Sequence, residues 1–236
     1  MNTKCLLYLL LIFFPFCVIA QEAGKKILIV PYPSMMYFSD ADNDIAHFSR
    51  STEPKIRTQL RLKLDSVINQ TLSKSFQTIN LLQATTLNSE QDLNRIYAAS
   101  HYYLTEKKNR GKYRSSLFER TKKNQDIFTI DSTTMLADIG DPELFQYLNQ
   151  KYSNNYILYF TQYEMNTSNK NTIEWMKQEY KREYILHYNL FDASGKLLLA
   201  ETLYFNGGNE NQINKITEKN FVPISQKLLE ILQSKL

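Results

Sequence analysis

The chain has 236 residues and a formal net charge of +4, with 43% hydrophobic and 22% charged residues. Both of its cysteines, Cys5 and Cys17, lie near the amino terminus, so the remaining sequence excludes disulfides, thiolate metal sites and a cysteine nucleophile. The six glycines form no phosphate-loop pattern, which argues against a nucleotide-binding crossover.

The first residues have the pattern of a secretory signal peptide. Lys4 provides a positive head, Cys5 to Ala20 is almost wholly apolar, and Val18-Ile19-Ala20 fits a signal-peptidase site. Pro15 interrupts this run, which is shorter than the roughly 20 residues of a membrane-spanning helix. The Phe-Pro-Phe before Cys17 does not fit lipid attachment.

We therefore predict a signal peptide at 1–20 and a single αβ domain at 21–236, exported to the periplasm or beyond the cell. Without disulfides, such a domain depends on its hydrophobic core for stability.

The mature chain opens with a predicted strand–helix–strand unit. Lys25 to Tyr32, "KKILIVPY", is a short apolar run typical of a buried strand. A helix begins near Thr52 and Pro54, and Phe76 to Gln83 forms the next strand. Apolar residues recur along this helix at helical spacing: Ile56, Leu60, Leu64, Val67, Ile68 and Leu72. A crossover of this kind makes its two strands parallel.

The middle of the chain predicts a second helix, a basic excursion and a third helix. Ser89 to Asp92 begins the second helix, whose inward residues are Leu93, Ile96, Tyr97 and Leu104. The excursion occupies about 107–127, the stretch from Gln125 to Gly140 has no clear pattern, and Asp141-Pro142-Glu143 starts the third helix.

The last third of the chain predicts three strands and a helix. Asn155 to Met165 is the most continuous strand pattern. Arg182 to Phe191 and Lys196 to Phe205 form a hairpin, with Gly195 at the position that needs a positive φ. The carboxyl-terminal residues are helical, with a kink or restart at Pro223. The order β-α-β-α-α-β-β-β-α predicts an α/β (α+β) fold, with helices packed on a mixed sheet.

This order and three local patterns resemble the periplasmic α/β domain of the curli-secretion-channel subunit family and of the TolB amino-terminal-domain group. The patterns are "KILIVPYP" before a long helix, "LNQKYSNNYILYFTQYE" leading into a strand, and "LFDASGKLLLAETLYF" with Asp192, Gly195 and Lys196 at its turn. The "MYFSDAD" stretch also resembles exported bacterial proteins of unknown function. The resemblance implies an envelope domain that serves assembly or transport machinery by binding other proteins.

This sequence departs from the channel subunits in two ways. It lacks a usable lipid-acceptor cysteine, and Asn166 to Lys177 is too short and polar for transmembrane barrel strands. The resemblance therefore does not imply pore formation.

The stretch from Met35 to Arg50, "MMYFSDADNDIAHFSR", is the densest polar patch. Its alternating aspartates match the first positions of a calcium-binding loop, but Ile45 and Ser51 occupy the positions where that motif needs Gly and Glu. A local interpretation has Ser39 or Asp40 capping a short helix, with Ile45 and Phe48 packed inward. A third interpretation is a ligand or partner loop at the strands' carboxyl ends. Its candidate residues are Met35, Met36, Tyr37, Phe38, Asp40, Asp42, Asp44 and His47.

Two surfaces have both a purely structural and a functional interpretation. The basic excursion is either a solvated segment or a contact for an anionic membrane surface or glycan, through Lys107, Lys108, Arg110, Lys112, Arg114, Arg120, Lys122 and Lys123. Alternating strand tyrosines either pack across strands or dock a protein or glycan; they are Tyr156, Tyr159, Tyr163, Tyr184, Tyr188 and Tyr204.

The sequence thus favours an exported envelope protein that binds envelope proteins without catalysis, resident cofactor or nucleic acid. One alternative is a secreted metal-dependent hydrolase that uses Asp40, Asp42, Asp44 and His47, with calcium as the weak metal candidate. Another is a periplasmic small-molecule binder with a pocket lined by residues 35–38.

Overall fold

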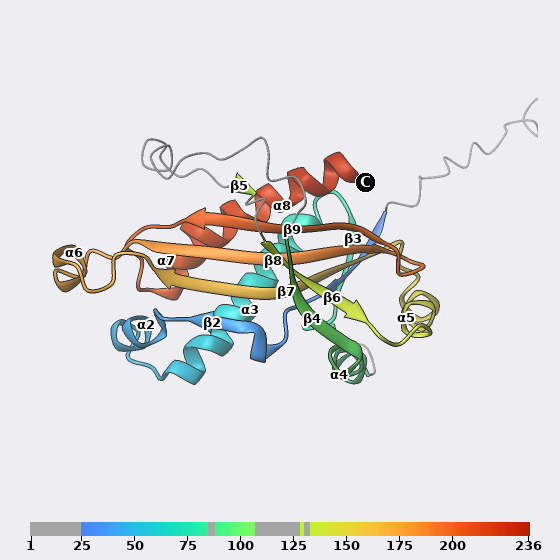
Figure 1. Cartoon of the computed structure of the whole chain (residues 1–236), viewed down its shortest axis with the longest axis horizontal. Helices are drawn as coiled ribbons and strands as arrows, with labels where there is room; N and C mark the ends of the chain where they lie inside the picture. The colour runs from blue at the N-terminus through green and yellow to red at the C-terminus, as the bar shows by residue number, and fades with distance from the viewer. Residues whose placement is uncertain (1–24, 85–87, 107–127, 130–132) are drawn as a thin grey trace, which may run out of the picture.

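The computed structural model describes residues 25–84, 88–106, 128–129 and 133–236. Within them, the fold is α/β, with a mixed seven-stranded sheet and a separate two-stranded sheet (Figure 1). No helix in this part of the chain is both long and apolar enough to cross a bilayer.

The main sheet has the spatial order β3-β1-β7-β8-β9-β5, and β2 pairs with the far half of β7. Strands β1, β2, β3 and β7 run parallel, whereas β7, β8, β9 and β5 are antiparallel neighbours. The strands are β1 (Lys26–Val30), β2 (Tyr37–Ser39), β3 (Gln77–Asn80), β5 (Phe128–Thr129), β7 (Tyr156–Thr167), β8 (Arg182–Asp192) and β9 (Leu197–Asn206). The small sheet pairs β4 (Ser100–Glu106) with β6 (Thr133–Ile139).

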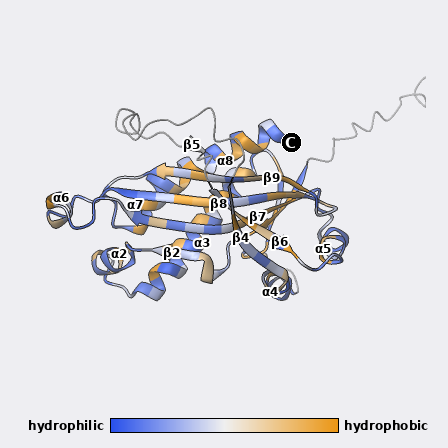
Figure 2. Ribbon diagram, in the orientation of Figure 1, coloured by the Kyte–Doolittle hydropathy of each residue, from blue (hydrophilic) through white to orange (hydrophobic). Residues whose placement is uncertain are grey.

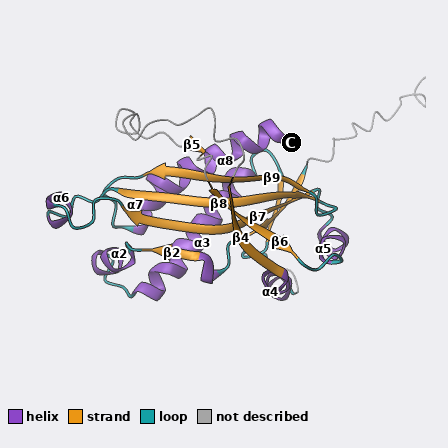
Figure 3. Ribbon diagram, in the orientation of Figure 1, coloured by secondary structure: helices purple, strands orange, loops and turns teal. Residues whose placement is uncertain are grey.

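Helices and short turns connect these strands (Figure 3). The α-helices are α2 (Asp42–Phe48), α3 (Glu53–Leu72), α4 (Ser89–Ala99), α5 (Leu144–Tyr152), α6 (Ile173–Met176), α7 (Ile213–Ile216) and α8 (Val222–Lys235). A 3₁₀ turn, η1 (Ser34–Met36), precedes β2, and a π-helical turn, η2 (Thr217–Phe221), precedes α8.

The first face of the main sheet carries the larger core. Helices α3 and α8 pack against each other and lie behind the sheet in Figure 1. Hydrophobic residues alternate with hydrophilic ones along α8 (Figure 2), as an amphipathic helix requires. Core residues on the strands of this face include Ile29, Phe160, Tyr163, Tyr184 and Phe205. The predicted βαβ unit is confirmed, since β1 and β3 are parallel and flank the connection through α3.

The second face of the sheet is covered over one half only. There α4, α5 and β6 pack on the apolar residues Leu28, Val30, Ile157, Tyr159 and Phe191. Strand β4 and strand β6 cross in front of the main strands in Figure 1. The covered half of the second face thus forms a smaller core near the start of β7.

Side chains of the main sheet bind the backbone of β6 directly. Asn189 Oδ1 accepts a hydrogen bond from Ala137 N at 2.8 Å, and Thr161 Oγ1 donates to Met135 O at 2.8 Å. Thr202 Oγ1 donates to Thr133 O at 3.0 Å. The second face therefore holds β6 through hydrogen bonds between side chains of the main sheet and the β6 backbone. No backbone ladder joins β6 to the main sheet among the described residues.

The structure corrects two predictions in the middle of the chain. Helix α4 ends at Ala99 and the chain turns into β4, so Leu104 is 61% exposed and does not face the core as predicted. The stretch from Gln125 to Gly140, predicted to lack a pattern, contains β6. Aromatic residues after Ser100 favour a strand, but that strand needs β6 as its partner, more than twenty residues further along the chain.

The carboxyl-terminal prediction holds with one refinement. The hairpin of β8 and β9 is present, and Gly195 adopts φ +88° at its turn. A side chain there would also collide with the Phe145 ring. Pro223 lies in the first turn of α8 and follows the π-helical turn η2. Because proline lacks an N–H, it cannot donate a helical hydrogen bond. The wider π-helical turn η2 precedes the position where this bond is missing.

A buried acid on α3 leads to a pH prediction. Burial raises the pKa of Asp65 from 3.8 to about 6, although hydrogen bonds from Asn80 and Gln83 and the nearby Arg61 oppose this rise. A raised pKa means that Asp65 stabilises the fold most below about pH 4, and that this contribution is lost as pH rises through about 6. The rise corresponds to about 3 kcal/mol.

We expect Asp65→Asn to remove this pH dependence. Urea unfolding of both proteins between pH 4 and pH 7.5 should show that the variant gains stability relative to wild type by about 2 to 3 kcal/mol over this interval. A constant difference between the two proteins would contradict the assignment.

Candidate functional site

The aspartate loop has one buried carboxylate. Asp42 is 2% exposed, accepts the Tyr37 hydroxyl at 2.5 Å and forms an ion pair with Arg57 Nε at 2.6 Å. These bonds tie β2 and α2 to the start of α3. The Asp42 carboxylate thus stabilises the packing of its own loop.

The other two aspartates of the loop point to different partners. Asp40 Oδ1 accepts Thr167 N at the end of β7 at 2.8 Å, and its other oxygen is 3.8 Å from Lys170 Nζ. Asp44 lies 3.9 Å from the guanidinium of Arg182. In the described part of the chain, no three His, Cys, Asp or Glu side chains form a group that fits a metal ion. The calcium site and the hydrolase stay predictions.

The remaining loop residues divide between core and solvent. Met36 is buried and Tyr37 packs on the first-face core, whereas Met35 is 76% and Phe38 49% exposed. These four side chains therefore do not face one common pocket. His47 is exposed and contacts the Phe48 ring edge-on.

The helical interpretation of this loop is right in part. Ile45 is buried in the core, and Asp42 and Asp44 lie in the first turn of α2. Phe48 is exposed, contrary to the prediction that it packs inward. Ala41 precedes the helix, and neither Ser39 nor Asp40 caps it by a side-chain bond, because Asp40 is bonded to β7.

Two other predicted surfaces differ in outcome. The eight basic residues between 107 and 123 lie outside the described residues. The strand tyrosines are buried almost completely, apart from the half-buried Tyr156, so cross-strand packing explains them and a tyrosine-rich docking face is wrong.

The candidate functional site is the half of the second face that no described helix or strand covers. Figure 1 shows β7, β8 and β9 running beyond the crossing of β4 and β6, with no helix in front of them. Their first-face residues are fully buried, whereas several second-face residues are partly exposed. We call this surface the open sheet face, defined by Phe38, Gln162, Glu164, Asn166, Glu183, Ile185 and His187.

Strand register arranges the open sheet face in rows. Glu164 lies between Phe38 on β2 and Ile185 on β8. The neighbouring rows pair Gln162 with His187 and Asn166 with Glu183. Directly paired residues share one face of a sheet, so these side chains project together. An anionic group thus lies between two apolar side chains, with a second carboxylate diagonal to it.

Hydrogen bonds keep Glu164 ionised. Its pKa is held below the ordinary value chiefly by His187, whose Nε2 is 3.5 Å away, and also by Asn166 and Gln162, although burial opposes the decrease. Gln162 Nε2 donates to the carboxylate at 2.5 Å and Asn166 Nδ2 at 3.3 Å. The lowered pKa therefore favours the ionised form of Glu164 at the centre of the open sheet face.

His187 marks the border between the open sheet face and β6. Its Nδ1 accepts a hydrogen bond from Met135 N at 3.2 Å and lies 2.9 Å from Thr202 Oγ1, and its Nε2 lies 3.5 Å from the Glu164 carboxylate. The imidazole thus orients the Glu164 carboxylate.

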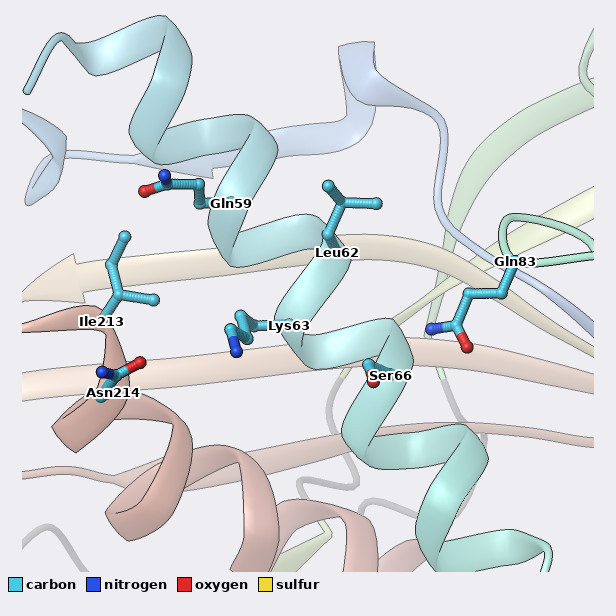
Figure 4. A pocket seen from close by; sticks show the side chains of 7 residues that line it. All are labelled: Gln59, Leu62, Lys63, Ser66, Gln83, Ile213 and Asn214. Carbon is cyan, nitrogen blue, oxygen red and sulfur yellow. The ribbon is translucent and has the colours of Figure 1, made fainter.

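A separate hollow of about 460 Å³ lies on the outer side of α3 (Figure 4). Gln59, Leu62, Lys63 and Ser66 from α3 line it, together with Gln83, Ile213 and Asn214. It contains neither the aspartate loop nor the open sheet face. Its lining has no acid–base pair or nucleophile with an activating partner, so it offers no evident chemistry.

Apart from Phe38, the predicted site residues do not include the open sheet face, although the sequence carries a signal for it. Alternation along β7 places Gln162, Glu164 and Asn166 on one face after an apolar first half. The change from apolar to polar indicates that the covering layer ends near residue 161. The second-face residues of β8 complete the surface only through pairing, which the sequence does not display.

Comparisons with known proteins add little to this geometry. No protein-family model matches the sequence, and no curated protein matches it. Among solved structures, a PelC dodecamer variant from Paraburkholderia phytofirmans is similar with a TM-score of 0.36 and 10% identity, over 89% of each chain. A second PelC dodecamer structure from the same organism has a TM-score of 0.34 and 8% identity, over 86% of each chain.

Proposed function

We propose that the protein is an exported, non-catalytic component of the bacterial cell envelope that binds another envelope protein through the open sheet face. The observation that carries this proposal is the half-covered second face. There a polar and apolar surface built on rigid central strands stays accessible in the described structure, whereas the first face is closed by helices.

Two sequence features support the envelope assignment. The predicted signal peptide leads to export. The resemblance to the curli-secretion-channel and TolB-like domains suggests an accessory role in assembly or transport. Binding on a sheet places the contact residues on rigid elements, which favours specific recognition.

Site-specific photo-crosslinking in the protein's own host tests this proposal. A crosslinking residue would replace Phe38 or Ile185 on the open sheet face. Leu62 on the outer side of α3 serves as the matched control, because its exposed fraction is close to that of Phe38. We expect a discrete crosslinked product from the first two positions, in the envelope fraction, and none from position 62. Equal products from all three positions, or none from the sheet, would contradict the proposal.

A further inference from the structure

The open sheet face carries carboxylates that no lysine or arginine of the described structure neutralises. Among the described residues, Glu164 has His187 as its one ion-pair candidate, and no lysine or arginine pairs with it. Glu183 is half-buried and forms no ion pair among the described residues. Two carboxylates on adjacent strands therefore face outward together, which favours a cationic partner.

A buried acceptor on a neighbour of Glu164 lacks a donor. Gln162 is 7% exposed, and its Nε2 is used by Glu164. Its Oε1 is buried without a hydrogen-bond partner. A buried acceptor without a donor is unfavourable, so a ligand donor that reached this atom would be favoured.

The surroundings of Glu164 fit the side chain of lysine or arginine. Phe38 and Ile185 flank the carboxylate on neighbouring strands, and Phe38 is 49% exposed. The aliphatic stem of a basic side chain can cover Ile185 while its charged head reaches Glu164. The aromatic ring of Phe38 adds a cation–π contact.

The spacing of the two carboxylates fits an extended segment. Glu164 and Glu183 are diagonal neighbours on adjacent antiparallel strands, a relation that separates side chains by about 7 Å. Residues at alternate positions of a strand lie on one side and are also separated by about 7 Å. Strand β6 already crosses the same face in extended form, held by Thr161, His187 and Asn189.

We infer that the open sheet face binds an extended, basic segment of a partner protein, with lysine or arginine at two alternate positions. One basic side chain meets Glu164, and the other meets Glu183. This inference rests on the proposed function and specifies the chemistry of its partner.

Fluorescence anisotropy with synthetic peptides tests the inference. The probe is a labelled peptide containing Arg-Val-Arg-Val, and the comparison peptide has the same composition as Arg-Arg-Val-Val. Because alternate residues share one side of a strand and adjacent ones do not, we expect wild-type protein to bind the first peptide about tenfold more tightly. Added salt should weaken this binding.

Matched variants identify the site. Glu164→Gln and Glu183→Gln should each weaken binding of the alternating peptide by about tenfold, as expected for the loss of a charge-assisted hydrogen bond. Glu230→Gln, an equal charge change on the exposed side of α8, should leave it unchanged. Thermal melting of each variant shows whether the fold is retained.

Three results would overturn the inference: no binding of the alternating peptide, equal binding of both peptides, or equal losses in the Glu230→Gln control. Binding of a cationic amino-sugar oligomer in place of the peptide would also reject it. If the crosslinks at positions 38 and 185 persist in these cases, the proposed function stands and only the partner's chemistry is wrong.

Discussion

Arg182→Ala is expected to lower the free energy of unfolding by about 3 to 5 kcal/mol. Arg182 is fully buried, donates to Glu210 O at 2.5 Å and to Asn211 Oδ1, and lies 3.9 Å from Asp44. Its guanidinium also stacks on the Tyr180 ring at 5.0 Å. Truncation leaves buried acceptors without donors and a cavity where a long, fully buried side chain was packed.

Urea unfolding measures this loss as a lower midpoint with an unchanged slope. The control is Lys181→Ala, which removes the same charge from the adjacent, exposed position. We expect this control to change stability by less than about 0.5 kcal/mol. A loss below about 1 kcal/mol for Arg182→Ala would show that the buried network around it does not stabilise the fold.

Asp92→Asn is expected to destabilise the protein by about 3 kcal/mol at neutral pH. Asp92 is 3% exposed and accepts bonds from Lys151 Nζ at 2.6 Å, Tyr147 OH at 2.8 Å and Tyr152 OH. These bonds join α4 to α5 over the smaller core. An amide at this position cannot pair with the lysine charge and places a donor opposite other donors.

The same network has a defined pH dependence. Burial opposes ionisation of Asp92, but the hydrogen bonds from Lys151, Tyr152 and Tyr147 outweigh it and hold the pKa of Asp92 below 3.8. The stabilisation is therefore present above pH 3.8 and is lost as pH falls through the lower folded value.

The stability difference between wild type and Asp92→Asn should therefore stay constant near neutral pH and shrink in strong acid. Glu90→Gln is the control, because it makes the same chemical change at an exposed position of α4. A control effect as large as that of Asp92→Asn would contradict the assignment to the buried network.

Local patterns were sufficient for the elements that form the main sheet. The apolar run of β1, the periodic residues of α3 and the turn at Gly195 each carry their signal within a few residues, and each is found where predicted. These signals arise from burial and backbone geometry, which act on neighbouring residues.

The small sheet was not predictable in the same way. The residues of β4 continue directly from α4, and its partner β6 follows the undescribed residues 107–127 and 130–132. Strand β6 is held by side chains of β7, β8 and β9, far away in the chain. No local pattern encodes such a contact, so helix periodicity was extended wrongly to Leu104.

The candidate site shows the same limit. Alternating aspartates suggested one shared ion, but the fold directs Asp40 to β7, Asp42 to Arg57 and Asp44 to Arg182. Conversely, Glu164 and Glu183 gave no sequence signal as a pair, because only antiparallel register makes them neighbours. Spacing along a chain predicts shared chemistry only when the backbone there is regular.

The sequence by itself determined the α/β class, the parallel pairing of β1 with β3 and the β8–β9 hairpin, and it predicts an export signal. Composition and short-range periodicity suffice for these, since they reflect local burial. Only the tertiary structure decided where β6 lies, which carboxylates are buried and which half of the sheet stays open. Those outcomes depend on long-range contacts that place residues from distant segments on one surface, and such contacts are not written in the order of neighbouring residues.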